Sequence, residues 1–164
     1  MCQENGTKIR TNKMTDYYEI KNISFGDLNE EDIHEILKDG RLASHFLERQ
    51  LCVWYPHLTF VDGRGHDHVD TEGNLYDQKC FTKGGLNFAP SNMIGKGRSL
   101  DEDLAHAHAK TITYIACDII DFPKVKVRFV KGEDLLKDYP KCKVPFKDRN
   151  LFFGLDNDPS FLIA

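Results

Sequence analysis

Two stretches near the start of the chain place hydrophobic residues at helical spacing. The apolar positions of the first stretch are Ile33, Ile36 and Leu37. Asn29 stands before them as a potential N-cap and Gly40 after them as a potential C′ residue, so we expect a helix over residues 29–39. A second helix is expected over residues 41–52. Its core-facing positions are Leu42, Phe46, Leu47 and Leu51.

Strand patterns and further helices alternate along the rest of the chain. We expect strands over residues 53–61, 111–120 and 124–131, a hairpin over residues 67–81, and helices from Ser99 to about 110 and over 133–139. This order predicts an α/β (α+β) fold, in which helices flank a mixed central β-sheet. Residues 1–15 are polar and are expected to be a flexible segment, with a single domain over residues 16–164.

The predicted hairpin carries the most informative polar residues. Asp77 and Lys79 are two positions apart, so a strand presents both side chains on one face. Asp67 can return beside them on the opposing strand. Carboxylates supply the hard oxygen ligands that Mg²⁺ prefers, and a neighbouring ammonium group can orient water or stabilise charge on phosphorus. The pattern therefore favours a divalent-ion site beside a phosphate.

The length of the turn decides which aspartate joins Asp77. A turn at residues 72–74 places Thr71 opposite Leu75 and Asp67 opposite Lys79, on the face of Asp77. A turn one residue shorter shifts the register and moves Asp70 onto that face instead. We prefer Asp67, and Asp70 remains the alternative.

These residues resemble the active-site motif of the PD-(D/E)XK nuclease superfamily, which includes many restriction endonucleases. The Asp-x-Lys part is Asp77-Gln78-Lys79, and His66 replaces the usual proline before Asp67. The resemblance implies a restriction-endonuclease-like fold and a metal-dependent endonuclease that cleaves double-stranded DNA to leave 5′-phosphates. It also implies one or two Mg²⁺ ions, replaceable by Mn²⁺, held by Asp67 and Asp77 with help from Glu48, and a catalytic role for Lys79. A junction-resolving or repair nuclease would share this core.

Basic residues cluster in two segments that contain no acidic residue. One is the glycine-rich stretch after the hairpin, where we expect Lys83, Lys96 and Arg98 to contact DNA. The other is the strand over residues 124–131, which would present Lys126 and Arg128 on its polar face. In the helix that follows Ser99, two-residue spacing sends His106 and His108 to different sides, so one of them can face the basic loop and contact phosphate.

The composition is typical of a globular domain and indicates the cellular compartment in which it works. Hydrophobic residues make up 40% of the chain and charged residues 29%, with a net charge of -4. The five cysteines form no Cys-x-x-Cys pair, and no run of residues is apolar enough for a signal core or a membrane span. We expect reduced thiols in a cytoplasmic protein that does not associate with membranes. An enzyme of this kind that cuts both strands of a palindromic site would act most simply as a homodimer.

Two other classes of protein remain open. His66, His68 and Glu72 resemble the opening of a cupin metal motif, which would make the chain a histidine-coordinated metal enzyme. A noncatalytic DNA-binding module would keep the basic loop without needing Asp67 or Asp77.

Overall fold

The computed structural model describes residues 6–11, 15–62 and 65–154. Its strands are β1 (Gly6–Thr11), β2 (Thr15–Ile20), β3 (Leu58–Phe60), β4 (His68–Asp70), β5 (Leu75–Phe81), β6 (Leu86–Asn87), β7 (Thr113–Asp118), β8 (Lys124–Lys131) and β9 (Lys143–Val144). Its helices are α1 (Glu30–Ile36), α2 (Gly40–Trp54), α3 (Glu102–Ala109), α4 (Gly132–Asp138) and α5 (Arg149–Phe153). Two single-turn 3₁₀ helices are η1 (Ser91–Met93) and η2 (Phe146–Asp148).

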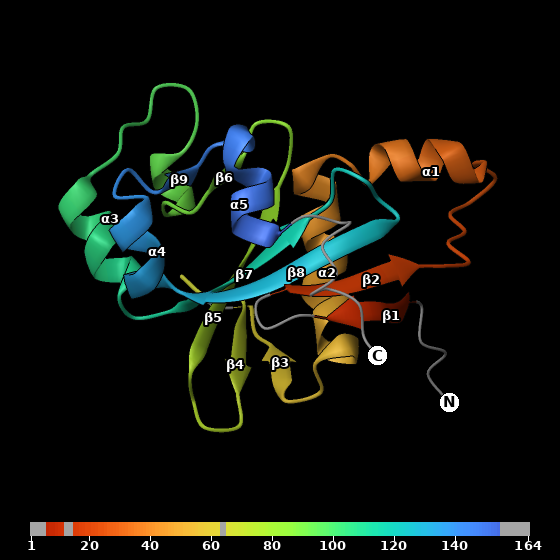
Figure 1. Ribbon diagram of the computed structural model, residues 1–164, viewed down its shortest axis with the longest axis horizontal. Helices are drawn as coiled ribbons and strands as arrows, with labels where there is room; N and C mark the ends of the chain where they lie inside the picture. Colours follow the sequence, from red (N-terminus) through yellow and green to blue (C-terminus); the bar gives the residue numbers. More distant parts are fainter. Residues whose placement is uncertain (1–5, 12–14, 63–64, 155–164) are drawn as a thin grey trace.

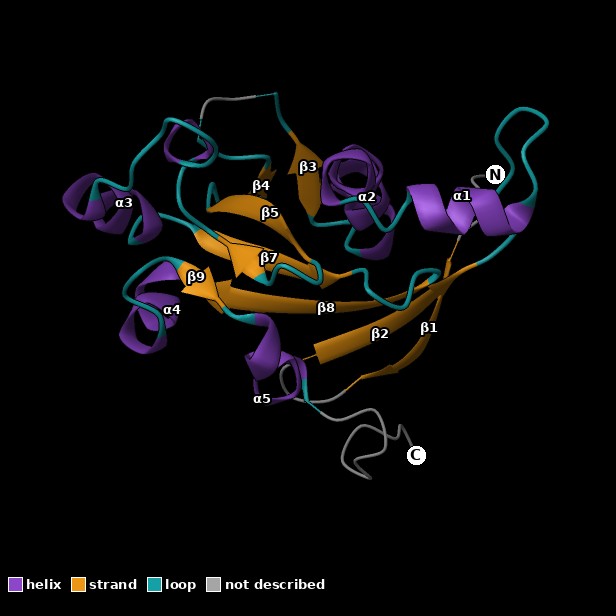
Figure 2. Ribbon diagram, turned by 90° about the horizontal axis from the view of Figure 1, so that it is seen from above, coloured by secondary structure: helices purple, strands orange, loops and turns teal. Residues whose placement is uncertain are grey.

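A mixed sheet of seven strands forms the centre of an α+β fold, in the order β1-β2-β8-β7-β5-β4-β3 (Figure 1). Strands β5 and β7 pair in parallel, and the other neighbours in this sheet are antiparallel. The sheet is strongly curled, and α2 and α5 cover opposite faces of it (Figure 2). The predicted mixed sheet with flanking helices is therefore confirmed. A second, two-stranded sheet pairs β6 with β9.

The segment expected to be loose at the start of the chain contains a strand. Residues 6–11 form β1, which pairs with β2 at one edge of the sheet, and the pairing register shifts between Lys8 and Arg10. The expectation for residues 1–15 is wrong for this part, because backbone pairing with β2 orders a stretch that has no apolar pattern. Residues 1–5 and 12–14 lie outside the described part of the chain.

Helix α2 is longer than its predicted counterpart and takes the start of the strand expected over residues 53–61. It continues to Trp54, whose indole stacks on the ring of Tyr18 at a centroid distance of 4.0 Å. This stacking holds the last turn against the sheet, and the helix ends just before Pro56, which disfavours helical backbone in the preceding residue. Gly40 opens α2 behind its N-cap Asp39, whereas the sequence suggested that Gly40 follows the end of the first helix.

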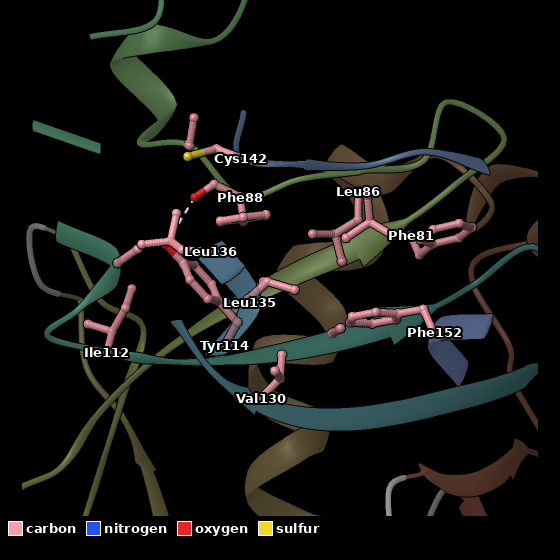
Figure 3. Packing of buried hydrophobic residues seen from close by; sticks show 14 of the residues in the cluster. Phe81, Leu86, Phe88, Ile112, Tyr114, Val130, Leu135, Leu136, Cys142 and Phe152 are labelled. Carbon is pink, nitrogen blue, oxygen red and sulfur yellow. Dashed lines mark hydrogen bonds between the residues drawn. The ribbon is translucent and has the colours of Figure 1, made fainter. Parts of the chain in front are cut away.

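Two hydrophobic clusters lie on the two faces of the sheet. On one face, Leu47 and Leu51 of α2 pack on Ile115 of β7 and on Val125 and Val127 of β8, and all five are buried. On the other face, α3, α4, α5 and the loop after β5 enclose a second cluster (Figure 3). Its residues include Phe81, Phe88, Tyr114, Val130 and Phe152, and the hydroxyl of Tyr114 donates to the carbonyl of Phe88 at 3.0 Å.

The C-terminal region is more ordered than its irregular sequence pattern suggests. Residues 140–154 show no clear helical or strand periodicity, but they form β9, η2 and α5. Phe152 and Phe153 of α5 are buried against the sheet, so burial of two aromatic rings supports a helix of only one or two turns. Within the described ranges, no helix is both long and apolar enough to cross a membrane.

Candidate active site

The hairpin of β4 and β5 forms as predicted, with a different register. Val69 pairs with Leu75, and the Asp67 amide donates to the carbonyl of Tyr76. The turn therefore covers residues 71–73 rather than 72–74, with Gly73 at a φ of +84° that favours glycine. Because the turn lies one residue earlier than predicted, the pairing of the two strands changes by two residues, and Asp67 lies opposite Asp77 instead of Lys79. Both aspartates stay on one face, as the sequence indicated.

Successive side chains of β5 point to opposite faces of the sheet. Tyr76 and Cys80 pack into the cluster around α2, whereas Phe81 packs into the cluster on the other face. Asp77 and Lys79 share the face of Phe81, and the Lys79 Nζ lies 3.3 Å from the Asp77 Oδ2. Only 14% of the Asp77 side chain and 18% of the Lys79 side chain are exposed, so this ion pair is largely removed from solvent.

Asp67 is fixed next to this pair from the start of β4. Its Oδ2 accepts a hydrogen bond of 2.9 Å from the backbone amide of Gln78. Burial raises the pKa of Asp77 to about 7; the nearby Lys79 lowers it, and the carboxylate of Asp67 raises it further. Two carboxyl groups thus converge where one ammonium group offsets part of their mutual repulsion.

Asp70 does not join these residues. Its Oδ1 accepts hydrogen bonds from the backbone amides of Glu72 and Asn74, each at 2.9 Å. Its Oδ2 accepts from the Asn74 side-chain amide and from the Tyr76 hydroxyl, also at 2.9 Å. The hydrogen bond from the Asn74 side chain is the main cause that lowers the pKa of Asp70 to about 2, and the other hydrogen bonds add to it. Asp70 therefore stabilises the turn, and the geometry favours Asp67 as the partner of Asp77.

Glu48 reaches the same region from α2. Its pKa is raised, mainly by burial and then by the charge of Asp67, while His45 and Arg49 lower it. The described residues contain no group of three or more His, Cys, Asp or Glu side chains placed to hold a metal ion. Glu48 therefore does not join the two aspartates as a third ligand in this structure, and its assistance to metal or water stays a prediction.

The predicted catalytic residues all line one open cleft of about 1310 Å³. Its walls come from the N-terminal half of α2, the hairpin, the loop after β5, and α3. Residues that line it include Arg41, Glu48, His66, Asp67, Asp77, Lys79, Ser91 and His108. The cleft is wide and mixed in charge, so it can admit a polar substrate to the Asp67–Asp77–Lys79 group.

The histidines divide between the cleft and structural roles. His108 lines the cleft, and burial, Lys79 and His66 together lower its pKa. The side chain of His106 points to another side of α3, where its Nε2 lies 2.7 Å from the carbonyl oxygen of Pro140. The helical spacing predicted this divergence but did not show which histidine meets the cleft. His108 is the residue that sequence reasoning left unassigned.

His66 and His68 do not form a common metal site. His66 lines the cleft, but His68 is fully buried, with its Nε2 2.6 Å from the backbone carbonyl oxygen of Glu48. Glu72 is exposed in the turn of the hairpin. This arrangement, in a fold with five described helices, gives no support to the cupin-like alternative.

The two predicted basic segments differ in exposure. Lys83, Lys96 and Arg98 are exposed on the loop that walls the cleft, and the Arg98 guanidinium also donates to the carbonyls of Ser91 and Ile94. Lys126 is only 6% exposed, so the expectation of an exposed basic face on β8 is wrong there. Its Nζ lies 5.7 Å from the ring centre of Tyr17.

Arg128 is also partly covered. Its guanidinium lies 4.3 Å from the ring centre of Phe152 and donates to the Phe152 carbonyl at 2.9 Å. Helix α5 therefore occupies the surface that the sequence assigned to DNA. The prediction missed this because nothing in the pattern of β8 shows that a later helix packs on its polar face.

Comparisons with models of protein families, with curated proteins and with solved structures found no significant match for this chain. The case for its function therefore rests on the geometry of the cleft.

Proposed function

We propose that the protein is a Mg²⁺-dependent endonuclease of the PD-(D/E)XK type, with a restriction-endonuclease-like fold, that hydrolyses phosphodiester bonds in double-stranded DNA. The observation that carries the proposal is the convergence of Asp67, Asp77 and Lys79 on one strand face inside an open cleft. The spacing of Asp77 and Lys79 and the preceding hairpin aspartate resemble the motif of that superfamily. A structural ion pair would need only one carboxylate for the single lysine.

The donor set suits Mg²⁺. This ion is typically held by one or two carboxylates and completes its coordination with water and substrate phosphate oxygens. Asp67 and Asp77 provide two hard oxygen donors, and a cation between them would relieve the repulsion that helps to raise the pKa of Asp77. When bound, Mg²⁺ polarises a phosphate and lowers the pKa of a coordinated water. Mn²⁺ has the same preference for oxygen ligands and is expected to substitute.

The side chains of the cleft have separate roles in this proposal. Asp67 and Asp77 hold the cation, and the amide of Gln78 fixes the carboxylate of Asp67 for that purpose. Lys79 orients the attacking water and donates to a phosphate oxygen as negative charge accumulates on it. Glu48, with its raised pKa, is placed on the cleft wall to position a water or accept its proton.

The exposed loop suits a nucleic-acid backbone. Lys83, Lys96 and Arg98 stand on the same loop that forms one wall of the cleft, and this loop carries no acidic residue. Such a surface attracts phosphates even though the net charge of the chain is negative. A restriction-type enzyme would use it on each subunit of a homodimer, whereas a junction-resolving or repair nuclease would need a different arrangement of DNA.

Plasmid cleavage under defined metal conditions tests the proposal. We expect nicking and linearisation of supercoiled plasmid with Mg²⁺ or Mn²⁺, and none with EDTA or with Zn²⁺ alone. Ca²⁺ should support DNA binding without cleavage. Asp77→Asn is expected to abolish cleavage, and Asp134→Asn, which changes an exposed aspartate on α4, is the matched control.

The outcomes separate the proposal from its rivals. Full cleavage in EDTA contradicts a metal-dependent mechanism, and cleavage restored by Zn²⁺ alone favours a histidine-metal enzyme. DNA binding that is unaffected by Asp77→Asn, with no cleavage in any metal, indicates a noncatalytic DNA-binding module. Products are expected to carry 5′-phosphates, which ligation without prior phosphorylation detects.

A further inference from the structure

A second, apolar pocket lies away from the carboxylates of the cleft. It has a volume of about 570 Å³ and is enclosed by the loop between β2 and α1, by α1 itself, and by the start of α2. Eight of the residues that line it are hydrophobic, namely Ile20, Ile23, Phe25, Ile33, Ile36, Leu37, Leu42 and Phe46. Asn22 and Ser24 are the two polar ones. The pocket has no titratable side chain in its wall, so it does not resemble a catalytic site.

The apolar surface of this pocket continues onto the outside of the molecule. Phe25 is 72% exposed, Leu42 52% and Ile36 42%, and Leu28 nearby in the sequence is 44% exposed. These are half of the eight large hydrophobic side chains that are exposed in the described part of the chain. A concentration of this kind marks an interaction surface more often than a site for an enclosed small molecule.

Acidic residues outnumber basic ones around this surface. Residues 20–46 carry six acidic side chains and three basic ones, and of the basic ones Lys38 pairs with Glu35 at 2.7 Å and Arg41 with Asp39 at 3.2 Å. Asp27, Glu30, Glu31 and Asp32 are exposed at the start of α1. The negative rim repels nucleic acid and anionic lipid. It also disfavours a symmetric dimer through this face, since each subunit would bring its acidic rim against the other.

We propose that this pocket and its rim, made by residues 20–46, bind a basic amphipathic helix of a partner protein. The apolar side of such a helix would place large side chains, spaced three and four residues apart, into the pocket and onto Phe25, Ile36 and Leu42. Lysine or arginine residues on its flanks would face Asp27 and the acidic residues of α1. The apolar contacts supply affinity, and the charges select the partner and speed its association.

Fluorescence anisotropy with designed peptides tests this proposal. The probe is a labelled helical peptide of leucine and lysine with leucines at positions i, i+3, i+4 and i+7. One comparison peptide replaces every lysine with glutamate, and another scrambles the order of the same residues. We expect saturable binding of the basic helix and at least tenfold weaker binding of both comparison peptides. Higher salt should weaken the binding.

Variants of the protein locate the binding surface. Leu42→Asn and Phe25→Ser change exposed side chains, so the fold should persist, and each is expected to weaken binding at least tenfold. Leu151→Ser, which alters a 77% exposed leucine on α5, should bind the peptide like wild type. Asp27→Asn combined with Glu31→Gln should weaken binding about threefold and reduce its dependence on salt. Phe25 lies in a loop, so its variant remains informative if Leu42→Asn fails to fold.

Three results would overturn the proposal. The first is equal binding of the basic and acidic peptides. The second is unchanged affinity in a folded Phe25→Ser variant. The third is a dimer in analytical ultracentrifugation that Phe25→Ser dissociates, because the occupant would then be a second copy of this chain. None of these variants alters Asp67, Asp77 or Lys79, so plasmid cleavage reports on the cleft independently.

Discussion

Strands β5 and β8 carry similar polar patterns but have different environments. Each places two charged residues two positions apart, Asp77 and Lys79 on β5 and Lys126 and Arg128 on β8. On β5 the charged pair faces an open cleft, beside a second carboxylate. On β8, Arg128 lies under α5 against Phe152, and the buried Lys126 lies near the ring of Tyr17 on β2. Alternation therefore shows which side chains share a face, and only the tertiary structure shows whether that face is accessible.

The two strands also differ in how their charges are satisfied. Beside β8, the Arg149 guanidinium donates to both Asp118 at 2.6 Å and Asp121 at 2.7 Å. On β5, one lysine faces two converging carboxyl groups, and the pKa of Asp77 is raised in consequence of burial and of Asp67. Lys126 adds a second positive charge near Asp118; burial raises the pKa of that carboxyl, and Arg149 and then Lys126 lower it, so two cations serve the two carboxylates beside β8. At β5 the two carboxyl groups share a single lysine, which leaves room for a further cation.

The largest expected difference is between two lysine substitutions. Lys79→Ala should reduce plasmid cleavage by about a thousandfold, because the transition state loses a positioned donor, while the fold stays intact. Lys126→Ala should leave the activity of the folded protein close to wild type. It should lower the free energy of unfolding by about 1–2 kcal/mol, since a buried side chain and its contact with Tyr17 are lost.

Cleavage assays and urea unfolding measure these two effects. Cleavage by Lys79→Ala within tenfold of wild type would remove Lys79 from the mechanism. A strong loss of cleavage in folded Lys126→Ala would show that the strand under α5 matters for catalysis after all.

The next largest effect compares the two aspartates of the hairpin. Asp67→Ala should reduce cleavage at least a hundredfold, because one of the two proposed metal ligands is lost. Asp70→Ala removes the same charge three residues away and should retain at least a tenth of the activity, a rise of at most about 1.4 kcal/mol in the barrier. It should also destabilise the turn that Asp70 holds together. Initial cleavage rates of the two variants measure this difference. A larger loss in Asp70→Ala than in Asp67→Ala would indicate that Asp70 is the metal ligand.

A smaller effect is expected from the histidines of α3. His108→Ala should slow cleavage about tenfold, because its imidazole lines the cleft near Lys79 and can contact the substrate phosphate. His106→Ala is the matched control, since this ring contacts Pro140 instead. Single-turnover cleavage rates measure the difference. Equal rates for both variants would exclude His108 from the reaction.

The last expected effect concerns stability rather than activity, namely its pH dependence in metal-free buffer. The pKa of Asp77 is raised from its ordinary value of 3.8 to about 7, so the folded state retains a proton that the unfolded state has lost. The stability that this proton contributes is complete below pH 4 and is lost as the pH rises through 7. Relative to Asp77→Asn, wild type should therefore lose about 1 kcal/mol per pH unit within this window.

Urea unfolding of both proteins at pH 5, 6 and 7, in the presence of EDTA, measures this difference. An unchanged difference between the two proteins across the window would contradict a raised pKa at Asp77.

The sequence predicted those parts of the site that depend on local order. The shared face of Asp67, Asp77 and Lys79 follows from strand alternation. It survives the shifted turn because the pairing changes by two residues, which leaves every side chain on its original face. The position of His108, the burial of Lys126 and the exclusion of Asp70 depend on contacts between segments far apart or on hydrogen bonds within the turn. The mixed sheet was predictable from the order of elements, but β1 and the last helix were not, since their sequence patterns are weak.

The two edges of the central sheet bear on how copies of this chain could associate. An open edge can recruit a strand from another molecule, and proteins limit this with short or irregular edge strands. Here one edge is β3, which covers only Leu58–Phe60, and the other is β1, with its register shift between Lys8 and Arg10. A continuous intermolecular sheet is thus disfavoured at both ends. If the protein acts as a homodimer, its subunits would meet through side chains on helices and loops, leaving their sheets separate.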